Sequence, residues 1–411
     1  MAIVRPFRAI RPGKEYAAAV AALPYDVMNS DEARELVEGN PNSFLHVDKA
    51  EIDLPAGTDI HSAQVYAKAA ENLNAMIRGG ILIQDDKPMF YIYQLTMNGT
   101  TQTGLVACAS VDEYQNGSIK KHELTRADKE EDRIRHVDIC NANTGPIFLA
   151  YRARLRVDAI MQGIIKASPP EYDFTAEDGI RHSVWVIHDD AAISEIISEF
   201  ESVSDLYIAD GHHRNASAAK VALKRRENVF SGYEEFNFYL AVLFPADQLC
   251  IMDYNRLVKF KATFGESELF EKLGQKFEIK KCDFQAKPEK IHDFGMYMNS
   301  QWYLLTARPE IVKGDVVGRL DVSILQDNVL TPIFGITDPR TDKNIDFVGG
   351  IRGLAELERR VDSGEFDIAF AMFPTSMAEL MDIADSGMIM PPKSTWFEPK
   401  LRSGLFVHSL E

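Results

Sequence analysis

Hydrophobic and polar positions near the start of the chain follow two different periods, which predicts both helices and strands there. Apolar residues recur at helical spacing from about Ile60 to Ile77, and Gly79-Gly80 ends that helix. Residues 89–96 and 104–111 are rich in the residue types that favour strands. Asn98-Gly99 lies between these two runs and predicts a β-hairpin.

Two helices are expected to begin at hydroxyl side chains, which accept hydrogen bonds from free N–H groups at helix starts. Ser30 is the expected N-cap of one helix, because Asp and Glu follow it. Thr125, helped by Asp128, is the expected start of a highly charged helix that runs to about His136.

The middle of the chain alternates apolar strands with polar turns. Residues 184–188, 206–209 and 237–244 are expected strands. The second of them leads directly into Asp210-Gly-His-His-Arg214, and a helix is expected from Asn215 to about Lys224.

Helices and strands alternate to the end of the chain, so the expected fold class is α/β, in a mixed α+β arrangement. Residues 346–349, for example, form an expected strand that enters a Gly-rich turn and then a helix. We expect an N-terminal α/β region over 1–110, a chemically dense region over 111–260, and a C-terminal α/β region over 261–411 that contributes a loop to the site. No linker stands out, so the boundaries are soft.

Composition and charge exclude several classes of protein. The chain has 411 residues and a formal charge of 45 − 62 = −17 at pH 7, with no long Lys/Arg block, so we expect no nucleic-acid partner. No stretch reaches the roughly 18 apolar residues that a membrane helix needs, so no membrane partner is expected. We expect a cytoplasmic protein: residues 16–24 could pass for a short signal core, but no polar cleavage region follows. A reducing compartment also fits four scattered cysteines without a CxxC pair: Cys108, Cys140, Cys250 and Cys282.

The strongest chemical signal is the turn Asp210-Gly-His-His-Arg-Asn215 between a strand and a helix. Free N–H groups at a helix N-terminus bind anions, and Gly211 lets the backbone approach a ligand closely. Arg214 can hold phosphate oxygens with two parallel hydrogen bonds, and Asp210 can bind Mg²⁺ or accept a proton. The alternative is that Asp210 caps the helix and that His212 and His213 are ordinary polar residues.

A second signal is Lys120-Lys-His-Glu-Leu-Thr125, in which Glu123 is a candidate general base and His122 a possible partner. The alternative is a solvated charged loop. Weaker candidates for phosphate contacts are Arg352, in Gly349-Gly-Ile-Arg-Gly353, and three residues of a proline-bracketed loop, Lys393, Ser394 and Thr395. A tight turn and a packed terminal segment explain these two motifs about as well. Near the start, Pro24-Tyr-Asp-Val27 is either a cover for the site or a simple turn.

The motifs together resemble a known family. A strand, Asp210-Gly-His-His-Arg214 and a helix are similar to the phosphate-binding turn of the ParB/sulfiredoxin superfamily, and within it to the free L-serine kinases. Further blocks extend the resemblance over nearly the whole chain, to a branch long catalogued as a domain of unknown function that includes pyrophosphate-dependent L-serine kinases. These blocks are Arg5-Pro-Phe, Pro24-Tyr-Asp-Val, Lys121-His-Glu-Leu-Thr, Asp346-Phe-Val-Gly-Gly and Met390-Pro-Pro-Lys-Ser-Thr.

The resemblance implies a ParB/sulfiredoxin-like catalytic core over 111–260, with additional α/β parts on both sides. It implies phosphorylation of free L-serine to O-phospho-L-serine by inorganic pyrophosphate with Mg²⁺, and it places the critical acidic residues on Glu123 and Asp210. His212, His213, Arg214 and Asn215 would then bind phosphate with Gly211. An ATP- or ADP-dependent kinase of a small hydroxyl compound and a non-catalytic phosphoserine or nucleotide sensor remain alternatives. The sequence leaves the oligomeric state open.

Overall fold

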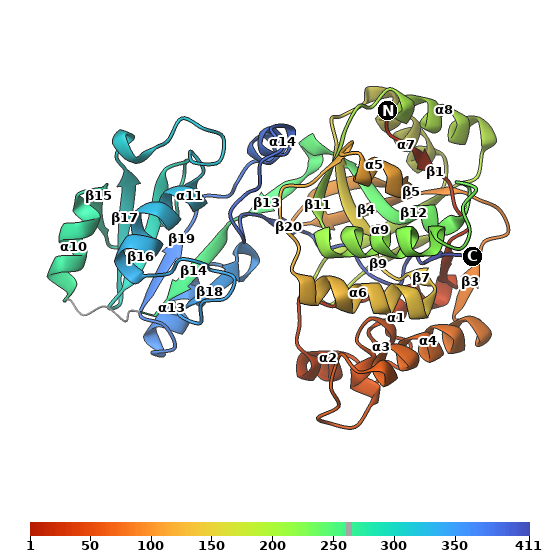
Figure 1. The fold of residues 1–411 in the computed structure, drawn as a ribbon, viewed down its shortest axis with the longest axis horizontal. Helices are drawn as coiled ribbons and strands as arrows, with labels where there is room; N and C mark the ends of the chain where they lie inside the picture. The colour runs from red at the N-terminus through yellow and green to blue at the C-terminus, as the bar shows by residue number, and fades with distance from the viewer. Residues whose placement is uncertain (260–264) are drawn as a thin grey trace. The chain divides into compact units, whose positions relative to one another are not determined.

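The computed structural model describes residues 1–259 and 265–411 and divides them into two compact units (Figure 1). Unit 1 comprises Met1–Lys121, Thr125–Leu249 and Pro399–Glu411. Unit 2 comprises His122–Leu124 and Cys250–Glu398. Both units contain helices and β-sheet, so the α/β class predicted from the sequence is confirmed.

Unit 1 is built on a mixed sheet, nine-stranded among the described residues, in the order β6-β11-β8-β12-β5-β4-β10-β9 with β1 beside β5. β6 runs parallel to β11, and β12 runs parallel to β8, whereas the other neighbours are antiparallel. The bounds of the strands are β1 Val4–Arg5, β4 Phe90–Met97, β5 Thr100–Ser110, β6 Ile119–Lys120, β8 Ile147–Tyr151, β9 Tyr172–Thr175, β10 Arg181–Ile187, β11 Leu206–Asp210 and β12 Phe238–Pro245.

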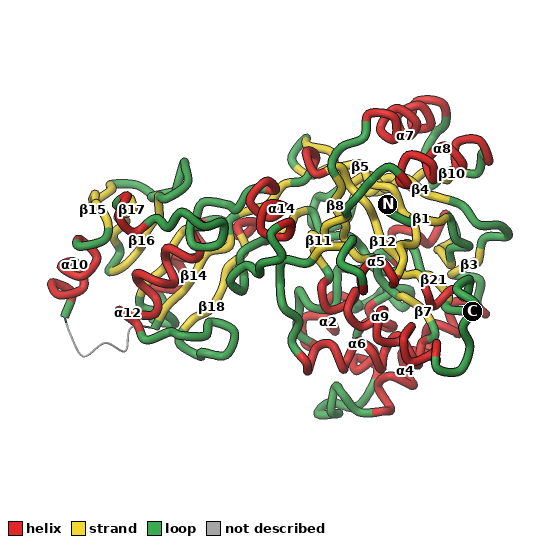
Figure 2. Tube along the Cα trace, turned by 45° about the horizontal axis from the view of Figure 1, so that its top comes forward, coloured by secondary structure: helices red, strands yellow, loops and turns green. Residues whose placement is uncertain are grey.

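The helices of unit 1 bury the apolar faces of this sheet. The main core unites strand residues with side chains from α7 (Leu155–Ala167), α8 (Asp190–Glu201) and α9 (His212–Arg226). A second core lies at the N-terminal helices, where α4 (Ala63–Arg78) packs against α6 (Ala127–Cys140), which in turn lies beside α9 (Figures 1 and 2). Smaller elements complete the unit: β2 Ile10–Pro12 with β3 Leu82–Gln84, β7 Ala142–Asn143 with β21 His408–Ser409, α1 Ala17–Val20, α2 Ser30–Leu36, α3 Leu45–Asp48 and α5 Val111–Gln115.

The hairpin predicted at Asn98-Gly99 is confirmed. Met97 of β4 pairs with Thr100 of β5, so the turn has two residues. Asn98 and Gly99 have φ values of 52° and 82°. Positive φ at both central residues is the condition for the type I′ turn, whose twist matches that of the flanking strands.

The predicted helices exist, but two of their caps are wrong. The N-cap of α2 is Asn29, not Ser30: its side chain accepts from Asp31 and Glu32, and Glu32 accepts from Asn29 in return. α6 begins at Ala127, and Thr125 donates its hydroxyl to Glu130 instead of capping. In α2, the neighbouring polar side chains of Asn29 and Ser30 compete for the same free N–H groups, and Asn29 takes them. In α6, the N-cap is Arg126, which makes no side-chain cap hydrogen bond.

Unit 2 contains an antiparallel sheet in the order β15-β17-β16-β19-β14-β18. The strand predicted at 346–349 is β18, and the Gly-rich turn and helix α13 follow it as expected. The bounds are β13 Cys250–Met252, β14 Tyr254–Val258, β15 Phe277–Cys282, β16 Asp293–Met298, β17 Gln301–Ala307, β18 Ile345–Gly349, β19 Ile368–Ala371, β20 Trp396–Glu398, α10 Glu266–Gly274, α11 Asp321–Leu325, α12 Thr331–Phe334, α13 Leu354–Asp362 and α14 Met377–Asp385.

The two units differ from the three regions expected from the sequence. In the sheet of unit 1, β5 and β4 from residues 1–110 lie between β12 and β10 from residues 111–249, so no boundary between compact units falls near residue 110. The expected boundary between 260 and 261 lies outside the described residues. Within the described part of the chain, no helix combines the length and the apolar run needed to cross a membrane.

Gly104 tests how tightly the sheet of unit 1 is packed. A Cβ atom there would lie 2.6 Å from Val242 Cγ1 and 2.7 Å from Phe244 Cζ. Gly104→Ala is therefore expected to lower the free energy of unfolding by about 1–3 kcal/mol, measured by urea denaturation. The matched control is Gly163→Ala in α7, where nothing lies within 4 Å. It should raise that free energy by about 0.5–1 kcal/mol, because alanine favours helix. Equal effects of the two variants would contradict the packing.

Candidate functional site

The turn that carried the strongest sequence signal joins β11 to α9 through a single residue. β11 ends at Asp210 and α9 begins at His212, three residues earlier than predicted. Gly211 lies between them with φ of 91°, in the left-handed region that side chains disfavour. The N-cap position of α9 is this glycine, which offers no capping side chain. The first N–H groups of a helix can bind an anion, and such binding at this turn stays a prediction.

Asp210 does not cap the helix, which removes the structural alternative for this residue. Its Oδ1 accepts from its neighbour Gly211 N–H at 2.8 Å, and its Oδ2 accepts from Lys400 Nζ at 2.8 Å. Burial opposes ionisation, but the Lys400 ammonium and the Gly211 N–H outweigh it and hold the pKa of Asp210 below its ordinary value. Asp210 is therefore a carboxylate throughout the neutral range.

Arg214 is held by groups from distant parts of unit 1. Its Nη2 lies 3.3 Å from Asp48 Oδ2 and 3.3 Å from Ser403 Oγ, and its guanidinium carbon lies 5.3 Å from the centre of the Tyr25 ring. Its neighbour Gly145 is required there, since a Cβ atom on it would lie 1.4 Å from Arg214 Nη1. The predicted phosphate ligand is thus also one partner of a buried ion pair.

The other predicted residues of α9 face different surroundings. His213 Nε2 accepts from Arg126 N–H at 3.0 Å, so this ring holds the start of α6. Asn215 is fully buried and donates to the Tyr239 hydroxyl at 3.2 Å. This placement gives no support to Asn215 as a phosphate ligand. His212 is buried in the first turn of α9.

The remaining predicted residues belong to unit 2. The backbone oxygen of His122 accepts from Met390 N–H at 2.8 Å, and its Nε2 lies 3.5 Å from Thr395 Oγ1. Glu123 is the next residue in the same short segment. His122 and Thr395 are 273 positions apart in the sequence, so the structure brings two distant sequence motifs together.

The proline-bracketed loop is fixed by its own hydrogen bonds. Lys393 has φ of 61°, its carbonyl accepts from Arg256 Nη2 at 2.9 Å, and its Nζ lies 5.7 Å from the Tyr254 ring centre. The Ser394 hydroxyl donates to the Pro391 carbonyl at 2.6 Å. These contacts are those of a packed terminal segment, although they leave the role of Lys393 in phosphate binding as a prediction.

Arg352 lies in the turn after β18, and the two glycines before it have a packing reason. A Cβ atom on Gly349 would lie 2.5 Å from the Trp396 ring, and one on Gly350 would lie 2.3 Å from Asp253 Oδ1. Close packing explains this Gly-rich motif without a nucleotide. Arg352 itself is exposed.

The predicted residues thus form two groups. Asp210 to Asn215 lie in unit 1, and the others lie in unit 2: His122, Glu123, Arg352, Lys393, Ser394 and Thr395. Sequence analysis missed Lys400, which is the ion-pair partner of Asp210, and Asp48, which is the partner of Arg214. No local motif marks either residue, because the partners are far apart in the sequence. Lys400 lies 190 positions from Asp210, and Asp48 lies 166 positions from Arg214.

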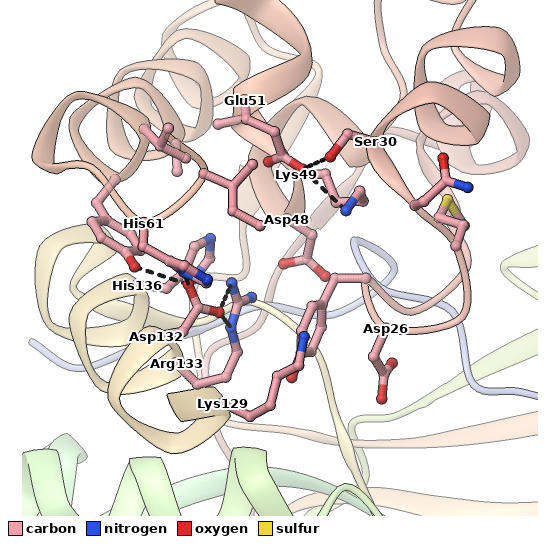
Figure 3. Close-up of a pocket in the computed structure, with 18 residues that line it drawn as sticks. Asp26, Ser30, Asp48, Lys49, Glu51, His61, Lys129, Asp132, Arg133 and His136 are labelled. Carbon is pink, nitrogen blue, oxygen red and sulfur yellow. Dashed lines mark hydrogen bonds and ion pairs between the residues drawn. The ribbon is translucent and has the colours of Figure 1, made fainter. Parts of the chain in front are cut away.

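A polar pocket of about 240 Å³ lies in unit 1, next to the partners of Arg214 (Figure 3). Tyr25 and Asp26, from the Pro24-Tyr-Asp-Val27 motif, line it together with Asp48 and the α6 residues Lys129 and Arg133. The Arg133 guanidinium carbon lies 3.9 Å from the centre of the Tyr25 ring. The Pro24-Tyr-Asp-Val27 motif therefore contributes to the wall of a pocket.

Asp210 could supply one ligand to Mg²⁺, but one carboxylate alone does not form a complete magnesium site. Each carboxylate oxygen has two acceptor positions, so both keep one beside the bonds from Gly211 and Lys400. Mg²⁺ commonly takes one or two protein carboxylates and completes its shell with water and substrate phosphates. Asp210 fits such an arrangement as a single ligand.

Three comparisons place the chain among known proteins. The family model of DUF1015, "Protein of unknown function", matches residues 4–323, and no curated protein matches. Among solved structures, a free serine kinase in complex with AMP is 15% identical, covers 74% of this chain and 92% of its own, and has a TM-score of 0.36. SbnI with a C-terminal truncation, from Staphylococcus aureus, is 11% identical, with coverage of 72% and 85% and a TM-score of 0.39.

A conserved hypothetical protein from Pyrococcus furiosus is 16% identical, with coverage of 74% and 94% and a TM-score of 0.35. These three structural likenesses are too distant to carry an argument about function. The family model, in contrast, spans most of the 411 residues. The chain therefore belongs to the DUF1015 family.

Proposed function

We propose that this protein is a phosphotransferase that phosphorylates free L-serine with inorganic pyrophosphate. The serine hydroxyl oxygen attacks one phosphorus atom of pyrophosphate, and the bond from that atom to the bridging oxygen breaks. The products are O-phospho-L-serine and phosphate, and the hydroxyl proton passes to a carboxylate. Acceptor and donor are taken from the family resemblance of the motifs, and the chemistry of the turn supports the class of reaction.

The observation that carries the proposal is the β11–Gly211–α9 turn. It presents a helix N-terminus without a side-chain cap directly after an ionised carboxylate. Phosphoryl transfer depends mainly on positioning and on neutralising phosphate charge, and helix N-termini supply oriented N–H donors for this purpose. Arg214, in the first turn of α9, adds a guanidinium.

The assignment of Glu123 rests on the family resemblance of the Lys121-His-Glu-Leu-Thr125 block, which places the second critical acidic residue on it.

The ion pair of Asp210 separates the roles of the two acids. A general base works best with a pKa near the working pH, and Lys400 holds the pKa of Asp210 low. We therefore assign Glu123 as the general base, with His122 as its neighbour, and Asp210 as a fixed negative charge at the turn. Mg²⁺, bound with the phosphates, would neutralise their charge. Lys393, Ser394, Thr395 and Arg352 remain predicted phosphate contacts.

A donor assay tests the reaction. The protein is incubated with L-serine, Mg²⁺ and, in separate arms, pyrophosphate, ATP or ADP, and phosphoserine is measured by mass spectrometry. We expect product with pyrophosphate. Product only with ATP or ADP would retain the kinase and reject the donor. Binding of phosphoserine or nucleotide without product in any arm would reject the kinase and favour a sensor.

The roles of the acids are tested by isosteric variants. Glu123→Gln should lower kcat by about 10²–10⁴-fold, because general-base catalysis contributes that much. Asp210→Asn should also lower kcat strongly, since it removes the fixed charge at the turn. Circular dichroism and thermal unfolding serve as folding controls, and Glu131→Gln on the exposed side of α6 serves as the matched variant. Near-normal turnover of Glu123→Gln would remove it from the chemistry.

The Lys400–Asp210 ion pair predicts a change in pH dependence. The folded-state pKa of Asp210 is lowered, so the ionised form persists as the pH falls well below neutrality. Lys400→Met removes the cause and raises that pKa, so the acidic limb of the kcat/KM profile should move to higher pH. Lys400→Arg keeps the charge and should leave the limb in place. An unchanged limb in Lys400→Met would show that Asp210 need not be ionised.

A further inference from the structure

We infer that the pocket lined by Tyr25, Asp48 and Arg133 is a binding site for a free α-amino acid in its zwitterionic form. Resting on the proposed function, the inference assigns this pocket to the L-serine acceptor. All residues that line this pocket belong to unit 1, whereas the proposed base Glu123 belongs to unit 2.

The pocket has the size of a small polar ligand with its water. Its volume of about 240 Å³ exceeds that of a few water molecules, each of which occupies about 30 Å³ in the liquid. Its walls come from the segment after Pro24, from the end of α3, from α4 and from the first turns of α6 (Figure 3). It lies inside one compact unit.

Charges of both signs line the pocket. The acidic residues are Asp26, Asp48, Glu51 and Asp132, and the basic ones are Lys49, Lys129 and Arg133. Burial, with Arg133 nearby, lowers the pKa of His136 to about 4, so its ring is neutral at pH 7. A polyanion such as pyrophosphate would meet the carboxylates, and an apolar ligand would leave buried charges unsolvated. A small molecule with one ammonium and one carboxylate could pair with the acidic and the basic lining residues at the same time.

The basic side has hydrogen-bond donors available for a carboxylate. Asp132 accepts from Arg133 Nε at 2.8 Å and pairs with its Nη2 at 2.7 Å through the same oxygen, Oδ2. No described residue accepts a hydrogen bond from Arg133 Nη1. Lys129 points from α6 toward the same space (Figure 3) and has no ion-pair partner among the residues that the structure describes.

The acidic side can accept an ammonium group. Asp48 is fully buried, and although burial alone would raise its pKa, Arg214 and other nearby groups hold it below the ordinary value. It is therefore a carboxylate. Asp26 lies on the other side of Lys129 from Arg133 (Figure 3) and forms no ion pair in the described parts of the chain. Ligand carboxylate and ammonium can thus face α6 and the Asp26 side respectively.

One aromatic ring connects the pocket to the proposed phosphate site. The guanidinium groups of Arg133 and Arg214 lie 3.9 Å and 5.3 Å from the centre of the Tyr25 ring. Arg214 belongs to the first turn of α9, directly after Asp210 and Gly211. An amino acid held by its charged groups beside Tyr25 would therefore present its side chain close to the anion-binding turn.

Calorimetric titration of the full-length protein without any phosphoryl donor tests the inference. L-serine is expected to bind, whereas L-serinamide, which lacks the carboxylate, and N-acetyl-L-serine, which lacks the ammonium, should each bind at least about tenfold more weakly. Pyrophosphate should not displace L-serine. Displacement by pyrophosphate, or equal binding of the three serine compounds, would overturn the assignment.

Lys129 and Asp26 line the pocket and form no ion pair with any residue that the structure describes, so they can be changed without loss of the fold. Lys129→Gln and Asp26→Asn are each expected to weaken L-serine binding by about tenfold, because a charge-assisted hydrogen bond is lost. Lys166→Gln on α7 removes the same charge elsewhere in unit 1 and should bind normally. Unchanged binding in both pocket variants would refute the site.

The result for this amino-acid site can be distinguished from the result for the proposed kinase activity. If both pocket variants bind L-serine normally and phosphorylate it with an unchanged KM, the site is refuted and the kinase proposal stands. Binding of L-serine that follows the variants as expected, with no phosphoserine formed from any donor, would confirm the site and refute the kinase.

Discussion

The candidate site depends on one backbone constraint, the left-handed conformation of Gly211. Because a single residue reverses the chain from β11 into α9, the last carboxylate of the strand and the first N–H groups of the helix lie next to each other. A longer connection would separate them. A residue with a side chain at this position would be strained by its φ of 91°. The negative Asp210 carboxylate and the positive N-terminal end of α9 are thus adjacent in the chain.

Near Arg214, unit 1 contains several buried charged residues. Asp48, Asp132 and Arg133 are all buried, and each is held by opposite charge or hydrogen bonds. A buried ion pair is seldom the cheapest way to stabilise a fold, because removing charges from water costs several kcal/mol per ion, roughly as much as the pair recovers. The proposed amino-acid site would use these buried charges, which line the pocket beside Tyr25. The guanidinium groups of Arg133 and Arg214 both lie near the Tyr25 ring.

Local patterns predicted the elements but not their long-range partners. The hairpin at Asn98-Gly99, the helix after Ile60 and the strand before Asp210 depend on neighbours in sequence, and all three are confirmed. The strand–turn–helix arrangement around Gly211 could be predicted for the same reason, whereas anion binding at this turn stays a prediction. Lys400 could not be predicted, since its contact with Asp210 depends on the return of the chain after 190 residues. Burial of Asn215 was missed because the helix begins earlier, which turns this residue toward Tyr239.

The last thirteen residues, Pro399–Glu411, belong to unit 1 although unit 2 precedes them. They supply Lys400 for Asp210, Ser403 for Arg214, and β21 for pairing with β7. During synthesis on the ribosome, the first 249 residues emerge long before this segment. Unit 1 therefore cannot reach its final state until residues 399–411 have been synthesised, and a product that terminates before them would lack Lys400, the cation that pairs with Asp210. Synthesis of this segment is in this way a condition for assembly of unit 1 around Asp210.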